Sequence, residues 1–206
     1  MNIFISSNNT SQGKTYSTLK LIEHFSKKGY KVAAFKPVET GVGDIPQDGL
    51  KLYEAIRKFN KFSEKITLED IVPVRLKLPA APIVAGKCDF SKIEKSYKKL
   101  KKISDILLIE GAGGLLVPVQ ENFYMKDFIN FFDAKLFMVF GSRLGMINDF
   151  LLNTYYLKSK NVDFVWGINI FDEQEYFEIS HPFMKKFKPM FIQKDIDKIT
   201  QKLLKD

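Results

Sequence analysis

Short, unbroken apolar runs alternate along the chain with longer segments in which apolar residues recur every three or four positions. The runs cover residues 3–5, 32–35, 106–109, 136–140 and 164–170, and residues 190–192 are a candidate for a short last strand. Apolar runs of this length are typical of strands covered on both faces. Strands that alternate with crossover helices predict an α/β fold, with a mostly parallel sheet, helices on both faces and right-handed connections.

Apolar spacing and helix-stopping residues set the predicted helices. Leu19, Ile22 and Phe25 share one face of a first helix, which Gly29 ends. Further helices are predicted from Asp48 onward and over residues 92–102, 125–132, 145–158 and 196–204. The proline-rich passage 73–82 cannot be regular helix, and we expect it to cross the sheet edge.

Length and cysteine content bound the class of protein. The 206 residues contain no repeat, low-complexity tract or linker, which predicts a single domain over residues 1–206. No apolar run approaches the ~20 residues of a membrane span, and a strand that begins within two residues leaves no room for a signal peptide. The single cysteine, Cys88, excludes an internal disulfide and fits a reducing compartment. We therefore expect a cytoplasmic protein with no membrane partner.

The net charge of +8 raises the question of a nucleic-acid partner. Of the 32 basic residues, only Arg57, Arg75 and Arg143 are arginine, the residue that suits bidentate contacts to phosphates and bases. The densest lysine stretch, residues 92–102, has apolar residues at helical spacing, which indicates an amphipathic helix with a solvated lysine face. We expect no nucleic-acid partner.

The segment Gly13-Lys14-Thr15 lies between the first strand and the first helix. A small-residue loop in that place aims backbone N–H groups and the positive end of a helix at one point. Lys14 adds a cation for the outer phosphates, and the Thr15 hydroxyl suits Mg²⁺. The pattern G-x-x-x-x-G-K-[ST] has Gly where this chain has Asn8, a residue type that tolerates positive φ. The segment predicts a phosphate-binding loop.

Two more polar segments follow buried strands: residues 36–41 after the second run and 110–114 after the third. The carboxyl ends of parallel strands share one edge of the sheet, where open α/β sheets bind ligands. Lys36 is either a lysine on a solvated turn or a functional cation beside the phosphate loop, and the second is favoured. Residues 40–41 are either a simple turn or a substrate contact. The glycines of 111–114 serve either helix packing or close approach of a ligand.

Oxygen ligands for Mg²⁺ are available at Thr15, Asp48 and Glu110. Glu110 ends a buried strand, where a carboxylate without a cation is costly, so a metal ligand is favoured over a structural ion pair. Asp48 stands between two interpretations, because Pro46-Gln47-Asp48 before an apolar helix is also an ordinary helix N-cap.

In this order the motifs resemble those of the ATP-dependent dethiobiotin synthetases. The resemblance runs from residue 2 to about 170 and rests on residues 8–15, Lys36-Pro37-x-x-Thr40-Gly41, 79–82, 110–114 and 144–148. The chain departs from the family at Ser7, where glycine is usual, and at Ser11, where an acidic residue is usual. Residues 189–193 do not match the family's usual base-binding loop.

The resemblance implies a homodimeric, ATP- and Mg²⁺-dependent cyclo-ligase of biotin biosynthesis. Such an enzyme converts 7,8-diaminopelargonate, CO₂ and ATP into dethiobiotin, ADP and phosphate. An amine of the substrate forms a carbamate with CO₂, the γ-phosphoryl group is transferred to the carbamate, and the second amine closes the ureido ring and expels phosphate. Phosphoryl transfer depends mostly on positioning and charge stabilisation, which suits the lysines and oxygen ligands named above.

The resemblance also implies roles for individual residues. Lys14 and Lys36 would be catalytic, Thr15, Asp48 and Glu110 would hold the metal, and Asn169 would read the adenine. The full nucleotide-binding set comprises Ser11, Gln12, Gly13, Lys14, Thr15, Tyr16, Asp48, Glu110, Gly111, Ala112, Gly113 and Asn169. The substrate-binding set comprises Thr10, Lys36, Thr40, Pro79, Leu144, Gly145, Ile147 and Asn148. Residues 144–148 would receive the substrate carboxylate at a helix N-terminus, from the neighbouring subunit.

The main alternative is a partner-regulated switch ATPase of the partitioning or septum-site type. Those proteins share the fold, but their loop carries an extra lysine near its start, where this chain has Ser7-Asn8-Asn9. The lysines of the C-terminal helix would suit a membrane surface, although packing on the sheet is favoured. A second alternative is an amide-forming ligase of cobalamin synthesis, but the chain shows no glutaminase domain or Cys/His nucleophile set. The motifs favour the synthetase.

Overall fold

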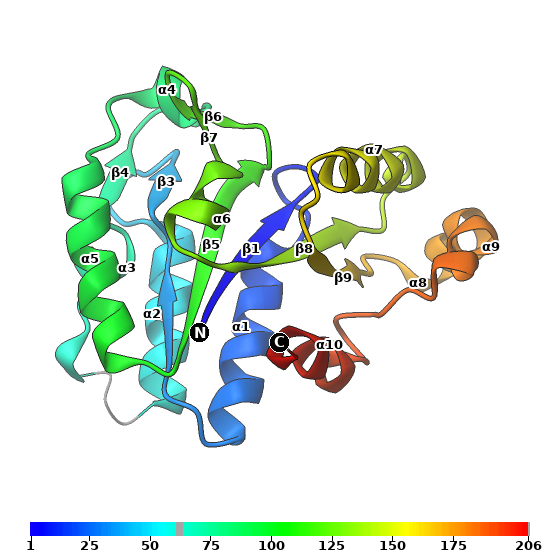
Figure 1. The fold of residues 1–206 in the computed structure, drawn as a ribbon, viewed down its shortest axis with the longest axis horizontal. Coiled ribbons are helices and arrows are strands. Elements are labelled where there is room, and N and C mark those ends of the chain that lie inside the picture. The colour runs from blue at the N-terminus through cyan, green and yellow to red at the C-terminus, as the bar shows by residue number, and fades with distance from the viewer. Residues whose placement is uncertain (61–63, 206) are drawn as a thin grey trace.

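The computed structural model describes residues 1–60 and 64–205. At its centre is a five-stranded sheet in the order β2-β5-β1-β8-β9, and every neighbouring pair is parallel (Figure 1). The strands are β1 (Asn2–Ser7), β2 (Val32–Phe35), β5 (Ile106–Gly114), β8 (Lys135–Gly141) and β9 (Phe164–Asn169). The predicted parallel sheet is confirmed.

The central strands are covered on both faces. Ile3, Phe4 and Ile5 of β1 are all fully buried, although successive side chains of a strand point to opposite faces. The main covering helices are α1 (Lys14–Lys27), α2 (Gln47–Phe59), α5 (Phe90–Ile103), α6 (Asp127–Phe131), α7 (Met146–Ser159) and α10 (Ile196–Leu204). Two-sided burial is why the strands read as unbroken apolar runs rather than alternating ones.

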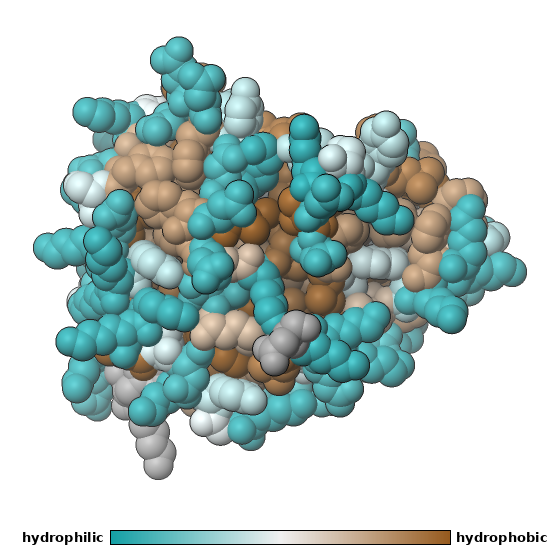
Figure 2. All heavy atoms as spheres, viewed as in Figure 1, coloured by the Kyte–Doolittle hydropathy of each residue, from teal (hydrophilic) through white to brown (hydrophobic). Residues whose placement is uncertain are grey.

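The lysine-rich helices are amphipathic, as predicted. In α5 the buried residues are Ile93, Ser96 and Leu100, and most of its lysines are exposed. Helix α10 buries Ile199 and Leu203 and packs against α1 and β9, which favours the packed helix over a membrane-surface one. Figure 2 shows hydrophilic side chains scattered over the viewed face rather than gathered into one patch. No helix in the described residues combines the length and the apolar character needed to cross a bilayer.

Several predicted boundaries were wrong in informative ways. Strand β5 runs through residues 110–114, so the glycine-rich segment extends the strand instead of following it. Residues 190–192 form no strand, because only Phe191 bridges to β9, at Ile168, before the chain turns away. Helix α6 begins at Asp127 rather than 125, helix α7 at Met146, and β9 ends at Asn169.

Short elements join the main ones. β3 (Val38–Thr40) pairs in parallel with β4 (Val74–Leu76) to form a small second sheet. The proline-rich passage therefore supplies one strand of this sheet, and it is not helical until α4 (Pro82–Ala85). The others are α3 (Leu68–Ile71), the hairpin β6 (Pro118–Gln120) and β7 (Phe123–Tyr124), α8 (Glu173–Glu175), a π-helix (Tyr176–Ser180), α9 (His181–Met184) and a 3₁₀ helix (Lys185–Phe187).

Candidate active site

The phosphate loop spans the gap between the end of β1 at Ser7 and the start of α1 at Lys14. Gly13 immediately precedes the helix with φ 99°, a left-handed conformation that favours glycine. A Cβ at this position would lie 2.1 Å from Nδ2 of Asn169, so the close approach also requires glycine. The loop is thus packed directly against the carboxyl end of β9.

Lys14 is buried and folded back onto the loop that precedes it. Its ammonium donates to Oγ of Ser7 at 2.9 Å and to the carbonyl of Asn9 at 3.1 Å. Burial and the neighbouring charge of Lys36 lower the pKa of Lys14 to about 8. Ser7, one of the two departures from the family pattern, therefore supplies a hydrogen-bond acceptor to this lysine.

Glu110 is fully buried, and each of its oxygens has partners. Lys36 donates to Oε1 at 2.7 Å and Thr15 to the same oxygen at 2.9 Å, while Thr18 donates to Oε2 at 2.9 Å. Thr18 was not predicted as a site residue. A carboxylate without water is costly unless it is paired, and the pairing here comes from a lysine and two hydroxyls.

Lys36 lies between two carboxylates, because its ammonium is also 3.1 Å from Oδ2 of Asp48. Burial alone lowers the pKa of Lys36, but the charges of Glu110 and Asp48 outweigh it and hold that pKa above its ordinary value. Burial likewise raises the pKa of Asp48, and Lys36 outweighs it, so that this pKa is lowered. Lys36 is therefore a permanent cation at neutral pH and cannot act as a general base.

Glu39, which sequence reasoning missed, holds the start of α2. Its Oε1 accepts from the backbone N–H of Asp48 at 3.0 Å and its Oε2 from that of Gly49 at 2.9 Å. The residue before the helix, Pro46, makes no side-chain cap. Glu39 thus caps α2 from outside the helix, which leaves the carboxylate of Asp48 to pair with Lys36. The N-cap interpretation of Asp48 was wrong, because that work is done by a residue nine positions earlier.

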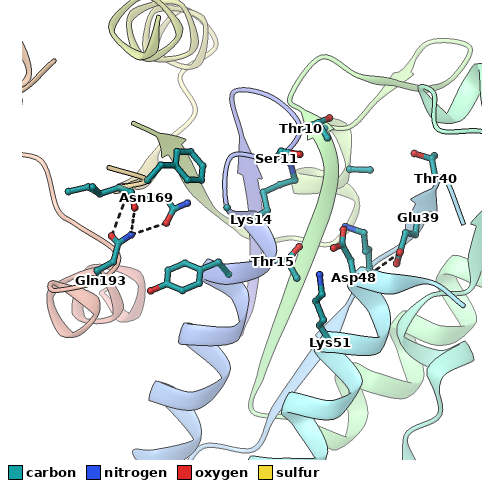
Figure 3. A pocket seen from close by; sticks show the side chains of 17 residues that line it. Thr10, Ser11, Lys14, Thr15, Glu39, Thr40, Asp48, Lys51, Asn169 and Gln193 are labelled. Atoms are coloured by element: carbon teal, nitrogen blue, oxygen red, sulfur yellow. Dashed lines mark hydrogen bonds and ion pairs between the residues drawn. The ribbon is translucent and has the colours of Figure 1, made fainter. Parts of the chain in front are cut away.

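A cavity of about 680 Å³ runs along the carboxyl edge of the sheet (Figure 3). Twelve of the predicted residues line it: Thr10, Ser11, Gly13, Lys14, Thr15, Tyr16, Lys36, Thr40, Asp48, Ala112, Gly113 and Asn169. Five residues that were not predicted also line it: Glu39, Lys51, Ile170, Phe171 and Gln193. Lys51 is one turn beyond Asp48 on α2, and an i, i+3 spacing from a candidate ligand was the available signal.

The remaining predicted residues lie elsewhere. Glu110 lies behind Lys36 and Thr15 rather than on the cavity wall, and Gln12 and Gly111 do not line the cavity. Pro79 packs near Gly41, because a Cβ added at Gly41 would lie 3.1 Å from Cβ of Pro79. Leu144, Gly145, Ile147 and Asn148 at the start of α7 do not line it either. One chain therefore does not bring the whole predicted set together.

At the other end of the cavity, two side-chain amides are hydrogen-bonded to each other. Gln193 donates from Nε2 to Oδ1 of Asn169 at 3.0 Å (Figure 3). Asn169 in turn donates from Nδ2 to the carbonyl of Gln12 at 3.3 Å. Asn169 is the last residue of β9, one residue before the predicted end of that strand. Residues 189–193 contribute Gln193 to the cavity even though they do not match the family's base-binding loop.

Comparison with known proteins identifies related sequences. A family model described as an AAA domain matches residues 1–201. The ATP-dependent dethiobiotin synthetase of a Sulfurovum species is 43% identical over 88% of this chain and 88% of its own length. That of Wolinella succinogenes is 35% identical over 98% of this chain and 97% of its own. The chain belongs to the dethiobiotin synthetase family.

Solved structures show how widely this fold is shared beyond the dethiobiotin synthetase family. A plasmid partition protein of Borrelia burgdorferi bound to AMPPNP superimposes with a TM-score of 0.58 at 14% identity, over 98% of each chain. The MinD cell division protein of Aquifex aeolicus gives 0.51 at 16% identity, over 92% of this chain and 79% of its own. These likenesses show the fold alone, whereas the sequence relatives are dethiobiotin synthetases, so the switch-ATPase alternative is not favoured.

Proposed function

We propose that this protein is an ATP-dependent dethiobiotin synthetase that converts 7,8-diaminopelargonate, CO₂ and ATP into dethiobiotin, ADP and phosphate. One observation carries the proposal beyond family membership. Lys36 is fixed between Glu110 and Asp48 at distances of 2.7 and 3.1 Å, in a cavity that also contains the phosphate loop and Asn169. A buried, permanent cation beside a phosphate loop is what transfer of a phosphoryl group to an anionic acceptor requires.

The nucleotide would lie along the cavity from the loop to β9. Its phosphates would accept from the backbone of residues 11–16 at the positive end of α1, and from Lys14 once this leaves Ser7. The glycine-rich stretch 111–113 would pass close to them, and Asn169 would contact the base. The packing of Gly13 against Asn169 supports this arrangement, because it links the phosphate and base ends of the site.

Mg²⁺ fits the oxygen donors that meet here. This ion takes hard oxygen ligands and usually keeps to one or two carboxylates, with phosphates and water completing its shell. Thr15 and Glu110 are in direct contact, and the carboxylates of Glu110 and Asp48 already converge on one cationic group, the ammonium of Lys36. Thr15, Asp48 and Glu110 would hold the ion, which when bound would neutralise charge on the phosphates.

The protein groups would then act by position and charge. Thr10 and Thr40, which line the cavity from two different segments (Figure 3), would orient the diamine or its carbamate. Lys36 would attract the carbamate oxygen and stabilise the charge that develops as the γ-phosphoryl group moves onto it. Lys14 would contact the same γ-phosphoryl group on the side away from Lys36. No side chain has to remove a proton for this transfer, which agrees with the raised pKa of Lys36.

We also propose that the working enzyme is a homodimer. Residues 144–148 would bind the far carboxylate of the substrate, yet they lie outside the cavity of their own chain. Leu144, Leu152 and Tyr155, at and beyond the start of α7, are 80%, 59% and 77% exposed. Large apolar side chains exposed together on one element favour contact with another protein surface. A second copy would bury them and bring its own residues 144–148 to the first copy's cavity.

Two broader expectations complete the proposal. Residues 1–206 would act as one nucleotide-binding synthetase domain. A cytoplasmic location remains a prediction, supported by the free, buried thiol of Cys88, which a reducing compartment would preserve.

The deciding experiment incubates the purified protein with 7,8-diaminopelargonate, bicarbonate, Mg²⁺ and ATP and detects dethiobiotin by mass. We expect product only when all four are present. Lys36→Ala should abolish product while leaving the fold intact by circular dichroism, and Lys95→Ala, an exposed lysine of α5, should behave as wild type. ATP hydrolysis without dethiobiotin, stimulated by a protein partner or by lipid, would overturn the proposal in favour of the switch ATPase.

A further inference from the structure

We propose that Gln193 is a positioning residue that locks the carboxamide of Asn169 in one orientation. In that orientation Asn169 favours a base with an amino group beside a ring-nitrogen acceptor, as in adenine, over a base with a keto group there, as in guanine. This inference rests on the proposed contact between Asn169 and the base. It assigns a function to the segment 189–193, which does not match the family's usual base-binding loop.

The orientation of Gln193 itself is set by backbone groups. Its Nε2 donates to the carbonyl of Ile170 at 2.9 Å, and its Oε1 accepts from the N–H of the same residue at 3.4 Å. A carbonyl can only accept and a backbone N–H can only donate. Rotating the Gln193 amide by 180° would therefore place donor against donor and acceptor against acceptor. One orientation satisfies both groups.

The same constraint passes to Asn169. The Nε2 group of Gln193 also donates to Oδ1 of Asn169 at 3.0 Å, which requires an oxygen at that position. On its other side, Nδ2 of Asn169 donates to the carbonyl of Gln12 at 3.3 Å, which requires a nitrogen there. The amides thus form a chain whose two ends are backbone groups of fixed polarity, and the order of oxygen and nitrogen in Asn169 is determined.

Packing holds this chain in place. Asn169 is 4% exposed, and the glycine at position 13 is what lets its amide approach the phosphate loop. On the side of Gln193, the N–H of Phe191 donates to Oδ2 of Asp195 at 2.9 Å, and Ile168 pairs with Phe191. Gln193 itself is exposed on the rim of the cavity and is not part of the core, so its hydrogen bond to Asn169 lies where a ligand can reach it.

The remaining hydrogen-bonding capacity of Asn169 defines the base that fits. Within the described part of the chain, its amide keeps one N–H and one oxygen lone pair without a protein partner, on a residue that lines the cavity. An asparagine amide pairs with adenine by accepting from N6 and donating to N7. Guanine offers O6 and N7, both acceptors, and would leave the oxygen of Asn169 facing another oxygen. With its C6 substituent in the same place as that of adenine, guanine could pair through O6 and N1–H only if the amide were turned over, which Gln193 opposes.

The test measures binding of ADP and GDP, each with Mg²⁺, to the purified protein by isothermal titration calorimetry. Gln193→Met keeps the length of the side chain and removes its hydrogen bonds. Gln201→Met makes the same change at an exposed glutamine of α10 and serves as the matched control. We expect wild type and Gln201→Met to prefer ADP by roughly tenfold or more, and this preference to fall close to unity in Gln193→Met.

Selectivity separates positioning from a merely structural role. A structural defect would weaken ADP and GDP by the same factor, so an unchanged preference in Gln193→Met would overturn the proposal. Gln193→Glu is a second variant of the same shape, which keeps an acceptor for the N–H of Ile170 and loses both donations; it should lose the preference too. Retained preference in Gln193→Glu, or a wild type that binds the two nucleotides equally or not at all, would also overturn it.

This experiment is independent of synthetase activity because it contains no diamine or bicarbonate. If ADP is preferred and Gln193→Met removes the preference, the inference stands even where dethiobiotin fails to form, and only the proposed reaction falls. If dethiobiotin forms but the preference does not depend on Gln193, the proposed function stands and this inference falls.

Discussion

At the scale of single residues, the two lysines of the site have opposite electrostatic environments although both are buried. Lys36 contacts two carboxylates, and its pKa lies above the ordinary value. Lys14 contacts a hydroxyl and a carbonyl, with Lys36 nearby, and its pKa is lowered to about 8. Lys36 thus has its countercharge within the protein, whereas Lys14 gains its countercharge from a ligand. This difference leads to a pH prediction for each state of the enzyme.

Nucleotide binding should take up a proton above pH 8. Phosphate oxygens beside Lys14 favour its charged form, so its pKa rises in the complex, and the affinity for MgADP falls as pH rises through about 8. Titration calorimetry at pH 8.5, in buffers of different ionisation enthalpy, measures the proton uptake directly. Lys14→Arg, which stays charged, should bind without uptake; uptake that persists in this variant would place the titrating group elsewhere.

The lowered pKa of Lys14 also affects the stability of the free protein. Stability should rise with pH, whereas nucleotide affinity should fall. Between about 8 and the ordinary value of 10.5, the unfolded chain binds a proton at Lys14 that the folded chain has lost. The free energy of unfolding should therefore gain a rising contribution with pH in this window, and Lys14→Met should remove that contribution. Urea unfolding of wild type and variant at several pH values measures the difference between the two slopes.

Glu39 shows that a residue outside a helix, here in the preceding strand β3, can determine the geometry of the helix end. Its two hydrogen bonds hold the backbone of Asp48 and Gly49, and burial raises the pKa of Glu39 against the effect of those bonds. Glu39→Gln keeps the shape of the side chain but replaces one of the two accepting oxygens by an NH₂ group. Only one of the two backbone N–H groups then keeps an acceptor. We expect a loss of about 1–3 kcal/mol in the free energy of unfolding. We also expect half-maximal activity to require a higher Mg²⁺ concentration, because Asp48 is displaced.

Denaturant unfolding and a Mg²⁺ titration of dethiobiotin formation together test the role of Glu39. Glu54→Gln, an exposed glutamate of the same helix, is the control and should change neither quantity. If Glu39→Gln lowers stability but leaves the Mg²⁺ dependence untouched, Glu39 supports the helix without positioning Asp48.

At the scale of elements, the sequence predicted what depends on local pattern. The runs 3–5, 32–35 and 106–109 became β1, β2 and the first part of β5 because unbroken apolar runs occur in strands buried on both faces. The extension of β5 through its glycines could not be read in this way, since glycine weakens a strand on its own. Here the ladder with β1 becomes irregular after Glu110 and resumes at Gly114, which pairs with Ser7. Residues 190–192 look like a strand and make one bridge only.

The same distinction holds for the site. Loop residues such as Gly13 and Thr15 were predictable, because strand, loop and helix are adjacent in sequence and their order carries the geometry. Glu39 and Gln193 were not, because each acts through a hydrogen bond whose partner is fixed only once the chain has folded. The pairing of β3 with β4 is a contact of the same kind, and it sets where Thr40 lies.

At the scale of the whole molecule, the proposed contact of residues 144–148 with the substrate needs a second copy of the chain, because these residues do not line the cavity of their own chain. If they serve the cavity of a second copy, each active site contains Lys36 from one chain and Asn148 from the other. Lys36→Ala and Asn148→Ala should then each be inactive alone. A mixed dimer of the two would combine both lesions in one site and leave the other site intact.

Mixing the two inactive variants therefore tests the dimer and its geometry together. With random exchange of subunits, half of the dimers are mixed and each has one of two sites intact, so dethiobiotin formation should recover to about a quarter of the wild-type rate. As a control, Lys36→Ala taken alone through the same mixing procedure should form no dethiobiotin. If each chain formed a complete site, every site in the mixed dimer would carry a lesion and no activity would return, even where light scattering shows a dimer. Recovery thus requires that two chains associate and that the carboxylate contact crosses between them.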